Sequence, residues 1–342
     1  MRARARHVRA RPVTEREVLL GVDVGGTTTS VGVVTRAGEV LVAQRVPTHR
    51  DGTGRALETI VELIAAVRRE AEGRSRAIAA IGVGVPGPVD TRRGRIGEDV
   101  PHVPELAGRA LAAELTARFG LPVFVDNDVN AQALGEWMFG AGRGACSLVV
   151  LAPGTGFGAG IVLEGRPVRG AAGFGGELGH TPVKFDGPPC WCGGRGCLAL
   201  YASGRGIAEA ARARLAGLAG APLLAAAGGD PLAITAPLVF RAAREGDPAA
   251  SAVVDEACRA LGAMLGTVVN GLNPDVVVIT GGVAESLVPL EAQILKRAGE
   301  YAFHRALALT RVTIVPGDKR TSMRGAAALA IYEIARAGGG TP

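Results

Sequence analysis

Hydrophobic and polar positions follow two different rhythms in the first part of the chain. Residues 18–24, 29–35 and 39–46 are short apolar runs separated by Gly-containing turns, which predicts three strands in an antiparallel meander. Residues 56–72 then show the spacing of an amphipathic helix, with apolar side chains at positions 57, 60, 61, 64 and 67. The chain therefore opens with consecutive strands and not with a strand-helix-strand unit.

Strands and helices alternate after the meander. Residues 78–85 are almost entirely apolar and end at Pro86, which predicts a buried strand. A helix is predicted over residues 106–119, a short strand over 123–125 and another helix over 129–139. This alternation is typical of an α/β protein with parallel pairing.

The order of strand, Gly-Thr turn and strand occurs twice, near residues 18–35 and 147–163. The second half continues with further predicted elements, namely helices at 204–217 and 247–272, strands at 275–280 and 311–315, and a closing helix at 322–336. This pseudo-repeat predicts two related lobes with a cleft between them. We expect residues 18–125 and 322–339 to form a small N-terminal lobe, and residues 126–321 to form a large lobe.

Composition and charge exclude several classes of protein. The 342 residues are 48% hydrophobic and 20% charged, as in a globular chain. Of the net charge of +6, five charges come from arginines in residues 1–12, so the remainder is nearly neutral and no nucleic-acid partner is expected. Residues 1–17 are expected to form a disordered basic tail. The longest uncharged stretch, residues 144–163, contains Pro153 and several glycines, so no membrane span or membrane partner is expected.

Cysteine and histidine residues gather in one short segment. The chain has five cysteines, an odd number that does not suggest a secreted disulfide framework, so the cytoplasm is the expected compartment. Four metal-binding side chains fall within eighteen residues: His180, Cys190, Cys192 and Cys197. One imidazole and three thiolates complete a tetrahedral site, which predicts a structural zinc loop at 176–200. The alternative is a set of unrelated reduced thiols.

Three Gly-rich turns each follow an apolar strand. Glycine lets backbone N–H groups approach phosphate oxygens, and an adjacent acid can hold Mg²⁺ or its water shell. Each turn by itself is more easily explained as a tight turn, but three of them favour a nucleotide site. The candidates are Asp23, Gly25, Gly26, Thr27, Gly154, Thr155, Gly156, Gly281 and Gly282.

A cluster of polar residues separates the predicted strand at 123–125 from the helix at 129–139. One interpretation is that Asp126 or Asp128 caps the helix by accepting hydrogen bonds from its first N–H groups. The other is that Asp128 is a general base that accepts a proton from a sugar hydroxyl during phosphoryl transfer. Spacing alone favours the cap.

Taken together, these motifs resemble the ROK family, which has an actin/hexokinase-like (ribonuclease H-like) two-lobed ATPase fold. The resemblance runs from about residue 19 to 335, and its most specific part is the Gly-Glu-Leu-Gly-His segment followed by three cysteines. It implies an ATP-dependent kinase that uses Mg²⁺, carries structural Zn²⁺ and forms a homodimer or homotetramer.

The resemblance also implies roles for individual residues. Asp128 matches the catalytic base, and the three Gly-rich turns match the ATP and Mg²⁺ region. His180 matches a residue that both binds zinc and contacts the sugar. The residues implied in substrate binding are Gly87, Asp99, Asn127, Asp128, Glu177 and His180.

Two positions depart from the pattern of glucose-type members. Ala199 stands where those members carry a glutamate, and Asp99 where they often carry an asparagine. A lost carboxylate removes charge-assisted hydrogen bonds to ring hydroxyls. We therefore expect phosphorylation of the primary hydroxyl of a glucose analogue, such as a C7-cyclitol or an aminosugar, with glucose itself as the alternative. A sugar-responsive repressor or an inactive sugar-binding protein is expected less, because only about 22 residues precede Asp23 and the catalytic motifs are retained.

Overall fold

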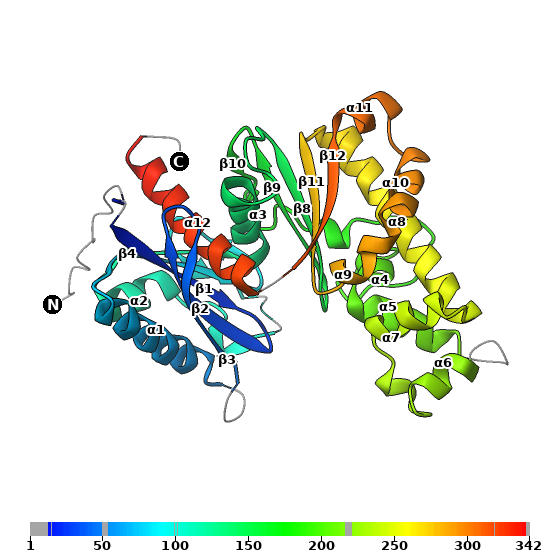
Figure 1. The fold of residues 1–342 in the computed structure, drawn as a ribbon, viewed down its shortest axis with the longest axis horizontal. Coiled ribbons are helices and arrows are strands. Elements are labelled where there is room, and N and C mark those ends of the chain that lie inside the picture. The colour runs from blue at the N-terminus through cyan, green and yellow to red at the C-terminus, as the bar shows by residue number, and fades with distance from the viewer. Residues whose placement is uncertain are drawn as a thin grey trace. The chain divides into compact units, whose positions relative to one another are not determined.

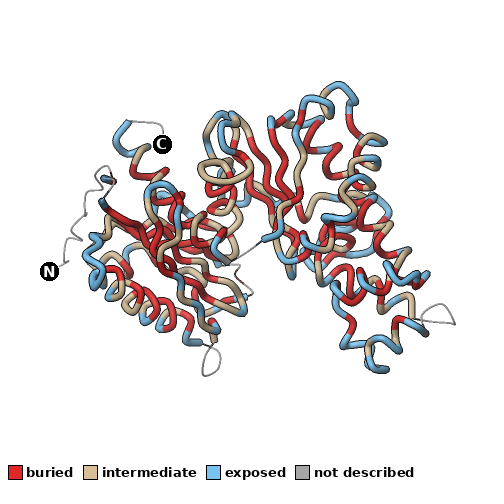
Figure 2. The backbone as a smooth tube through the Cα atoms, viewed as in Figure 1, coloured by how far each residue is buried: buried red, intermediate tan, exposed pale blue. Residues whose placement is uncertain are grey.

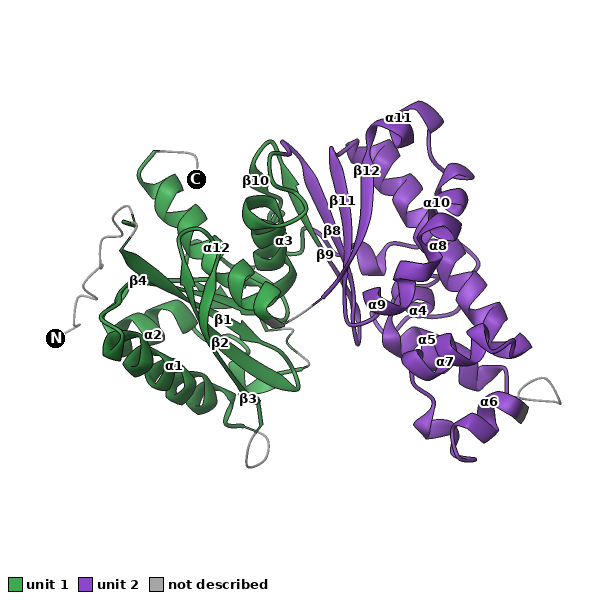
Figure 3. Cartoon of the chain, in the orientation of Figure 1, with its two compact units in different colours: residues 1–144, 160–175, 318–342 green, residues 145–159, 176–317 purple. Residues whose placement is uncertain are grey.

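A computed structural model describes residues 13–14, 16–49, 54–98, 100, 102–215, 221–317 and 319–339. Contacts divide the chain into two compact units (Figure 3). Unit 1 comprises residues 1–144, 160–175 and 318–342, and unit 2 comprises residues 145–159 and 176–317. Most of the expected tail at 1–17, as well as Asp99, lies outside the described residues.

Unit 1 is built on a five-stranded sheet with the order β3-β2-β1-β4-β7. Its strands are β1 (Glu17–Val24), β2 (Thr28–Thr35), β3 (Val40–Pro47), β4 (Ala77–Val85) and β7 (Val123–Asn127). The first three pair antiparallel, which confirms the predicted meander, whereas β4 is parallel to β1 and β7 is parallel to β4. The carboxyl ends of β1, β4 and β7 therefore lie at one edge of the sheet.

Helices pack on both faces of this sheet, and its inner strands are buried along most of their length (Figures 1 and 2). The helices are α1 (Ala56–Gly73), α2 (Leu111–Phe119) and α12 (Lys319–Ala337). Successive residues of β1 alternate between two cores, since Leu20 packs with the α1 side and Leu19 packs with α12. The hydrophobic alternation of the sequence thus buries both faces of the strand.

Helix α3 (Asp128–Phe139) packs directly against α12. A Cβ atom on Gly135 would lie 2.7 Å from the Cα of Gly325, so the two helices meet through glycines. This contact groups residues 126–144 with unit 1, whereas the sequence-based division begins the large lobe at residue 126. The smaller elements of unit 1 are β5 (Val89–Asp90), β6 (Arg95–Ile96), η1 (Pro104–Leu106) and β10 (Arg166–Pro167).

The second large sheet has the strand order β10-β9-β8-β11-β12. Its longer strands are β8 (Leu148–Pro153), β9 (Phe157–Leu163), β11 (Val276–Gly281) and β12 (Arg311–Pro316). β11 pairs parallel with β8 and β12, whereas β9 and β10 pair antiparallel. Both large sheets are mixed, which confirms the predicted α/β class.

The long helix α8 (Pro248–Leu272) lies at the centre of the helical part of unit 2. It begins where the Asp247 carboxylate accepts a 2.7 Å hydrogen bond from the Ala250 N–H, and it ends at Asn273 in the left-handed region. The other helical elements are η2 (Leu178–His180), α4 (Ala199–Ala202), α5 (Gly204–Ala213), α6 (Ala221–Ala226), η4 (Pro231–Ala233), α7 (Ala236–Arg244), α9 (Ala284–Leu287), η5 (Val288–Leu290), α10 (Glu291–Gly299) and α11 (His304–Leu309).

Some predicted helix limits are wrong. The helix expected over 106–119 begins only at Leu111, because Gly108 adopts a φ of +66° and interrupts the backbone after η1. The helix expected over 204–217 ends at Ala213. Helices α7 and α10 were not predicted. No helix among the described residues is long and apolar enough to cross a membrane.

Candidate functional site

Unit 1 brings its candidate residues to the carboxyl edge of its parallel strands. The strand register aligns Asp23 of β1 with Gly84 of β4, and Gly84 in turn with Asp126 of β7. The turn at 25–27, the loop at Gly87 and the start of α3 therefore follow neighbouring strand ends. Ligands of open α/β sheets bind at such edges.

Asn127 is the residue that caps α3. Its side-chain oxygen accepts hydrogen bonds from the N–H groups of Val129 at 2.9 Å and Asn130 at 3.2 Å. Its amide nitrogen donates to the carbonyl oxygen of Gly87 at 3.2 Å. The expectation that Asp126 or Asp128 caps the helix is therefore wrong, because Asp126 is still in β7 and Asp128 is already helical.

Asp128 is the first residue of α3 and is half-buried. A Cβ atom on Gly84 would lie 3.1 Å from its Cα, so the absence of a side chain at residue 84 lets the helix start close to β4. One carboxylate oxygen accepts a hydrogen bond from the Val129 N–H at 3.0 Å. A helix N-terminus favours negative charge at this position, and since Asn127 supplies the cap, the carboxylate is not required for capping.

A buried ionic network that was not predicted lies directly behind this site. Arg169 donates through Nε to Asp126 at 2.7 Å and through a terminal nitrogen to Glu333 at 2.7 Å. Burial raises the pKa of Asp126, and the Arg169 guanidinium opposes this rise. The three residues lie far apart in the sequence, so no local motif could have revealed the network.

The turn at 25–27 is closed by its own backbone. The Gly25 N–H donates to the Thr28 carbonyl at 3.0 Å, and the Thr48 hydroxyl donates to the Gly25 carbonyl at 2.6 Å. A Cβ atom on Gly26 would lie 2.8 Å from the Cβ of His102, so glycine is needed here for packing. Thr27 is exposed at the tip. The turn is thus a tight turn that still presents a hydroxyl to solvent.

The turn at Gly154–Gly156 in unit 2 has a different character. The Gly154 N–H donates to the Gly156 carbonyl at 2.9 Å, but a Cβ atom on either glycine would meet nothing within 4 Å. Neither glycine has a positive φ. Since neither packing nor backbone conformation requires glycine at these positions, the open backbone suits the close approach of a ligand.

Gly281 and Gly282 lie beside this turn. A Cβ atom on Gly281 would come within 2.7 Å of the Pro153 carbonyl oxygen, which also accepts a 3.0 Å hydrogen bond from the Val283 N–H. Gly282 has open space around its Cα. The ends of the parallel strands β8 and β11 therefore bring the two predicted nucleotide turns of unit 2 together.

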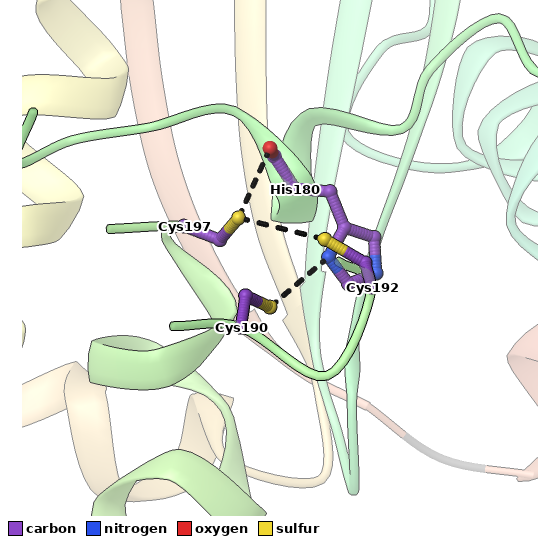
Figure 4. Close-up of side chains that lie close together, drawn as sticks. All are labelled: His180, Cys190, Cys192 and Cys197. Carbon is purple, nitrogen blue, oxygen red and sulfur yellow. Dashed lines mark hydrogen bonds between the residues drawn. The ribbon is translucent and has the colours of Figure 1, made fainter. Parts of the chain in front are cut away.

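The His/Cys segment folds into a compact four-residue cluster (Figure 4). One ligand atom from each of its members lies within 4.8 Å of the others: His180, Cys190, Cys192 and Cys197. The Cys190 sulfur is 3.7 Å from His180 Nδ1, and the Cys192 and Cys197 sulfurs are also 3.7 Å apart. A tetrahedral zinc with Zn–S bonds of about 2.3 Å separates its sulfurs by about 3.8 Å.

The donor set therefore fits zinc better than a disulfide, which needs sulfurs about 2.05 Å apart. Burial and the neighbouring thiols raise the pKa of Cys197 to about 12. By contrast, a hydrogen bond from the Gly194 N–H lowers the pKa of Cys192. A bound cation stabilises thiolates and would oppose the rise at Cys197. These four residues could hold Zn²⁺ as a closed structural site.

The ROK family model matches residues 19–333. The chain belongs to the ROK family. It is 34% identical to the glucokinase of Thermotoga maritima over 91% of this chain and 96% of that protein. It is 32% identical to the N-acetyl-D-glucosamine kinase of Escherichia fergusonii over 90% of this chain and 98% of that protein.

A solved ROK structure is also similar to this chain. The ROK glucokinase of Streptomyces griseus, determined with glucose and AMPPNP, superposes with a TM-score of 0.70 at 32% identity, covering 91% of this chain and 98% of that one. This similarity confirms the predicted fold family.

Two further candidate residues of this ROK protein lie in unit 2. Glu177 is exposed and directly precedes η2, whose last residue is His180. Ala199, by contrast, begins α4 and is 1% exposed. Its carbonyl oxygen accepts a 2.6 Å hydrogen bond from the Ser203 hydroxyl. Residue 199, where glucose-type members carry a glutamate, is therefore buried two residues after the last cysteine of the metal cluster.

Proposed function

We propose that this ROK protein is an ATP-dependent kinase that phosphorylates the primary hydroxyl of a glucose-like ring. The observation that carries this proposal is the position of Asp128, at the start of a helix and at the carboxyl edge of a parallel sheet, where Asn127 already supplies the cap. The carboxylate of Asp128 is therefore not the cap of α3.

Asp128 acts as the general base in the proposed reaction. Its carboxylate accepts the proton of the acceptor hydroxyl while the hydroxyl oxygen attacks the γ-phosphorus of ATP and ADP leaves. Asn127 and Gly87 are already joined by a 3.2 Å hydrogen bond, so the loop after β4 and the start of α3 form one rigid edge. We assign both residues to binding of the sugar ring.

The Gly-rich turns bind the nucleotide in this proposal. Asp23 and the turn at 25–27 serve the phosphates and Mg²⁺, and Thr27 presents its exposed hydroxyl there. The turn at Gly154–Gly156 serves the phosphates with its open backbone, and Gly281 and Gly282 serve the adenosine. Bound Mg²⁺ would neutralise charge on the phosphates, whereas these residues would position the phosphates for transfer.

The metal loop has a supporting role. His180 contributes Nδ1 to the metal cluster, which leaves Nε2 for a hydroxyl of the acceptor. Glu177 is exposed three residues earlier and provides a second acceptor of sugar hydrogen bonds. With Zn²⁺ bound to His180, Cys190, Cys192 and Cys197, the orientation of the imidazole would be fixed.

We further propose that the acceptor is a glucose analogue, such as a C7-cyclitol without an anomeric hydroxyl or an aminosugar. Ala199 supports this, because a buried methyl group replaces the carboxylate expected in glucose-type members. Asp99, which lies outside the described residues, is the second position that departs from the glucose-type pattern. Glucose is the second candidate, supported by the relatives named glucokinase.

ADP release with Mg-ATP tests both levels of this proposal. The panel consists of glucose, N-acetylglucosamine, glucosamine and a valiolone-type cyclitol. Acceptor-dependent ADP release supports the kinase, and the ranking of kcat/KM identifies the acceptor. Feeble turnover of every analogue beside rapid turnover of glucose overturns the analogue proposal and leaves the kinase intact.

A further inference from the structure

Trp191, between two predicted zinc ligands, contacts a cation outside the metal loop. The Arg205 guanidinium lies 4.4 Å from the centre of the Trp191 ring, which is cation–π geometry. The ring also meets the His180 imidazole edge to face, with centroids 6.5 Å apart. The Nε of Arg205 also donates a 2.7 Å hydrogen bond to the Glu209 carboxylate. Trp191 is 40% exposed, so burial alone does not explain its position.

The same arginine is bound to the open Gly-rich turn through its backbone. The Arg205 N–H donates to the Thr155 carbonyl at 3.1 Å, and the Gly204 N–H donates to the Gly154 carbonyl at 2.8 Å. A Cβ atom on Gly204 would lie 3.0 Å from the Gly154 oxygen, so the helix start is pressed against the turn. The first residues of α5 thus bind Gly154 and Thr155, two of the residues that the proposed function assigns to phosphate binding.

The chain that leaves the metal loop also leads directly to the start of α5. Cys197 is followed by α4, and the Ser203 hydroxyl both donates to the Ala199 carbonyl at 2.6 Å and accepts from the Gly206 N–H at 2.9 Å. The metal loop therefore ends in the cap of α5. A second contact joins η2 to β9, the strand that follows the turn at Gly154–Gly156. A Cβ atom on Gly179 would lie 2.1 Å from the Phe157 carbonyl oxygen, so η2 packs closely on this strand.

We infer that Arg205 is a positioning residue that couples the metal loop to the nucleotide turn through its stacking on Trp191. This inference rests on the proposed function, because it takes Gly154–Gly156 as a phosphate-binding turn. With the metal loop ordered, Trp191 fixes Arg205, and the backbone of Arg205 fixes Thr155. Metal binding therefore raises the affinity for the nucleotide. This effect is separate from its effect on the His180 imidazole, which the proposed function assigns to the sugar.

Binding of a non-hydrolysable ATP analogue to the zinc-loaded protein, measured by calorimetry, tests the coupling. We expect Arg205→Gln and Trp191→Leu each to raise the dissociation constant of the analogue about threefold to tenfold. The double variant is expected to bind the analogue with a dissociation constant no higher than that of the weaker-binding single variant, since both substitutions remove the same contact. Arg205→Lys, which keeps the cation, is expected to restore part of the affinity.

Arg259 is the matched control in this experiment. It forms an i,i+4 ion pair with Asp255 and has the same 53% side-chain exposure as Arg205, but no aromatic ring of the described residues stacks on it. Arg259→Gln is expected to leave affinity unchanged. Zinc content and melting temperature are measured for each variant, and the acceptor KM is expected to stay within twofold.

Trp191 fluorescence gives a readout that does not depend on turnover. The chain has only two tryptophans, so Trp137→Phe leaves Trp191 as the single emitter. We expect the ATP analogue to shift its emission, and chelation of the metal to lower nucleotide affinity to that of Arg205→Gln. Equal affinity in wild type and both variants, or additive losses in the double variant, overturns the coupling. A wild-type protein that binds no nucleotide overturns the proposed function itself.

Discussion

Asn127 and Asp128, at the start of α3, have different roles. Asn127 accepts hydrogen bonds from two helix N–H groups, whereas Asp128 is one residue further and half-buried. The sequence could place both residues between a strand and a helix. It could not assign the cap, because the choice depends on whether the strand ends at residue 125 or at residue 127.

The Asp128→Asn variant tests whether Asp128 is the general base without disturbing the fold. The amide keeps the size of the side chain and its hydrogen bond from the Val129 N–H but cannot accept the proton. We expect kcat to fall by about 10²–10⁴-fold, with the acceptor KM, the zinc content and the melting temperature nearly unchanged. Steady-state kinetics and thermal melting measure this, and a variant with wild-type kcat would show that another group takes the proton.

Ala199→Glu tests the origin of acceptor choice. A restored carboxylate regains charge-assisted hydrogen bonds to ring hydroxyls, which corresponds to about tenfold or more in kcat/KM for glucose relative to a cyclitol. Ala199→Gln is the control of equal size without charge. The ratio of the two kcat/KM values is the measurement. An unchanged ratio in both variants contradicts a role for residue 199 in acceptor choice.

Three elements meet at the buried ionic network. Asp126 is in β7, Arg169 follows β10, and Glu333 is on α12, so the network joins segments separated by more than 160 residues. The Asp126 side chain is 2% exposed and that of Glu333 is 9% exposed. The Arg169 guanidinium bridges these two buried carboxylates, and Glu333 is also paired with Arg336 at 2.8 Å.

Arg169→Met removes that guanidinium and leaves both carboxylates without it. We expect a loss of about 3–5 kcal/mol in the free energy of unfolding at neutral pH. Burial already raises the pKa of Asp126, and the variant loses the cation that opposes this rise. The folded variant then holds a proton that the unfolded chain releases, so its stability falls as the pH rises.

Urea unfolding at pH 5 and pH 8 measures this dependence. The deficit of Arg169→Met is expected to be larger at pH 8, and Asp126→Asn in the same variant is expected to recover part of it. A deficit that is equal at both pH values would show that the network acts by packing and not by charge.

Elements with a strong periodic pattern could be predicted from the sequence. The meander of β1, β2 and β3 and the helices α1 and α8 follow their hydrophobic spacing closely. Helices α7 and α10 were missed because each has only nine residues, which is short for a clear helical period. The metal cluster could be predicted from spacing alone, since its four residues are local, but the Arg169 network and the Trp191–Arg205 contact depend on tertiary packing.

At the scale of the whole molecule, the predicted zinc site is formed by four of the described residues of unit 2. A structural zinc binds the folded chain more tightly than the unfolded one, so its removal destabilises the protein. We expect one zinc ion per chain by native mass spectrometry and a fall in melting temperature of roughly 5–15 °C after chelation.

Cys258 provides a matched control for the metal site. It is a buried cysteine of the same unit that lies outside the cluster. Cys258→Ala is expected to keep its zinc, whereas Cys197→Ala is expected to lose it. Retention of zinc by Cys197→Ala would contradict the assignment of the cluster.

The central claim is that this ROK protein transfers phosphate from ATP to a glucose-like ring with Asp128 as the base. ADP release with Mg-ATP, measured for wild type and Asp128→Asn with and without acceptor, tests it most directly. We predict acceptor-dependent turnover by the wild type with a kcat/KM of about 10⁴ M⁻¹s⁻¹ or more for at least one acceptor, and its loss in the variant. ADP release that no acceptor increases, or that survives in Asp128→Asn, would contradict the claim.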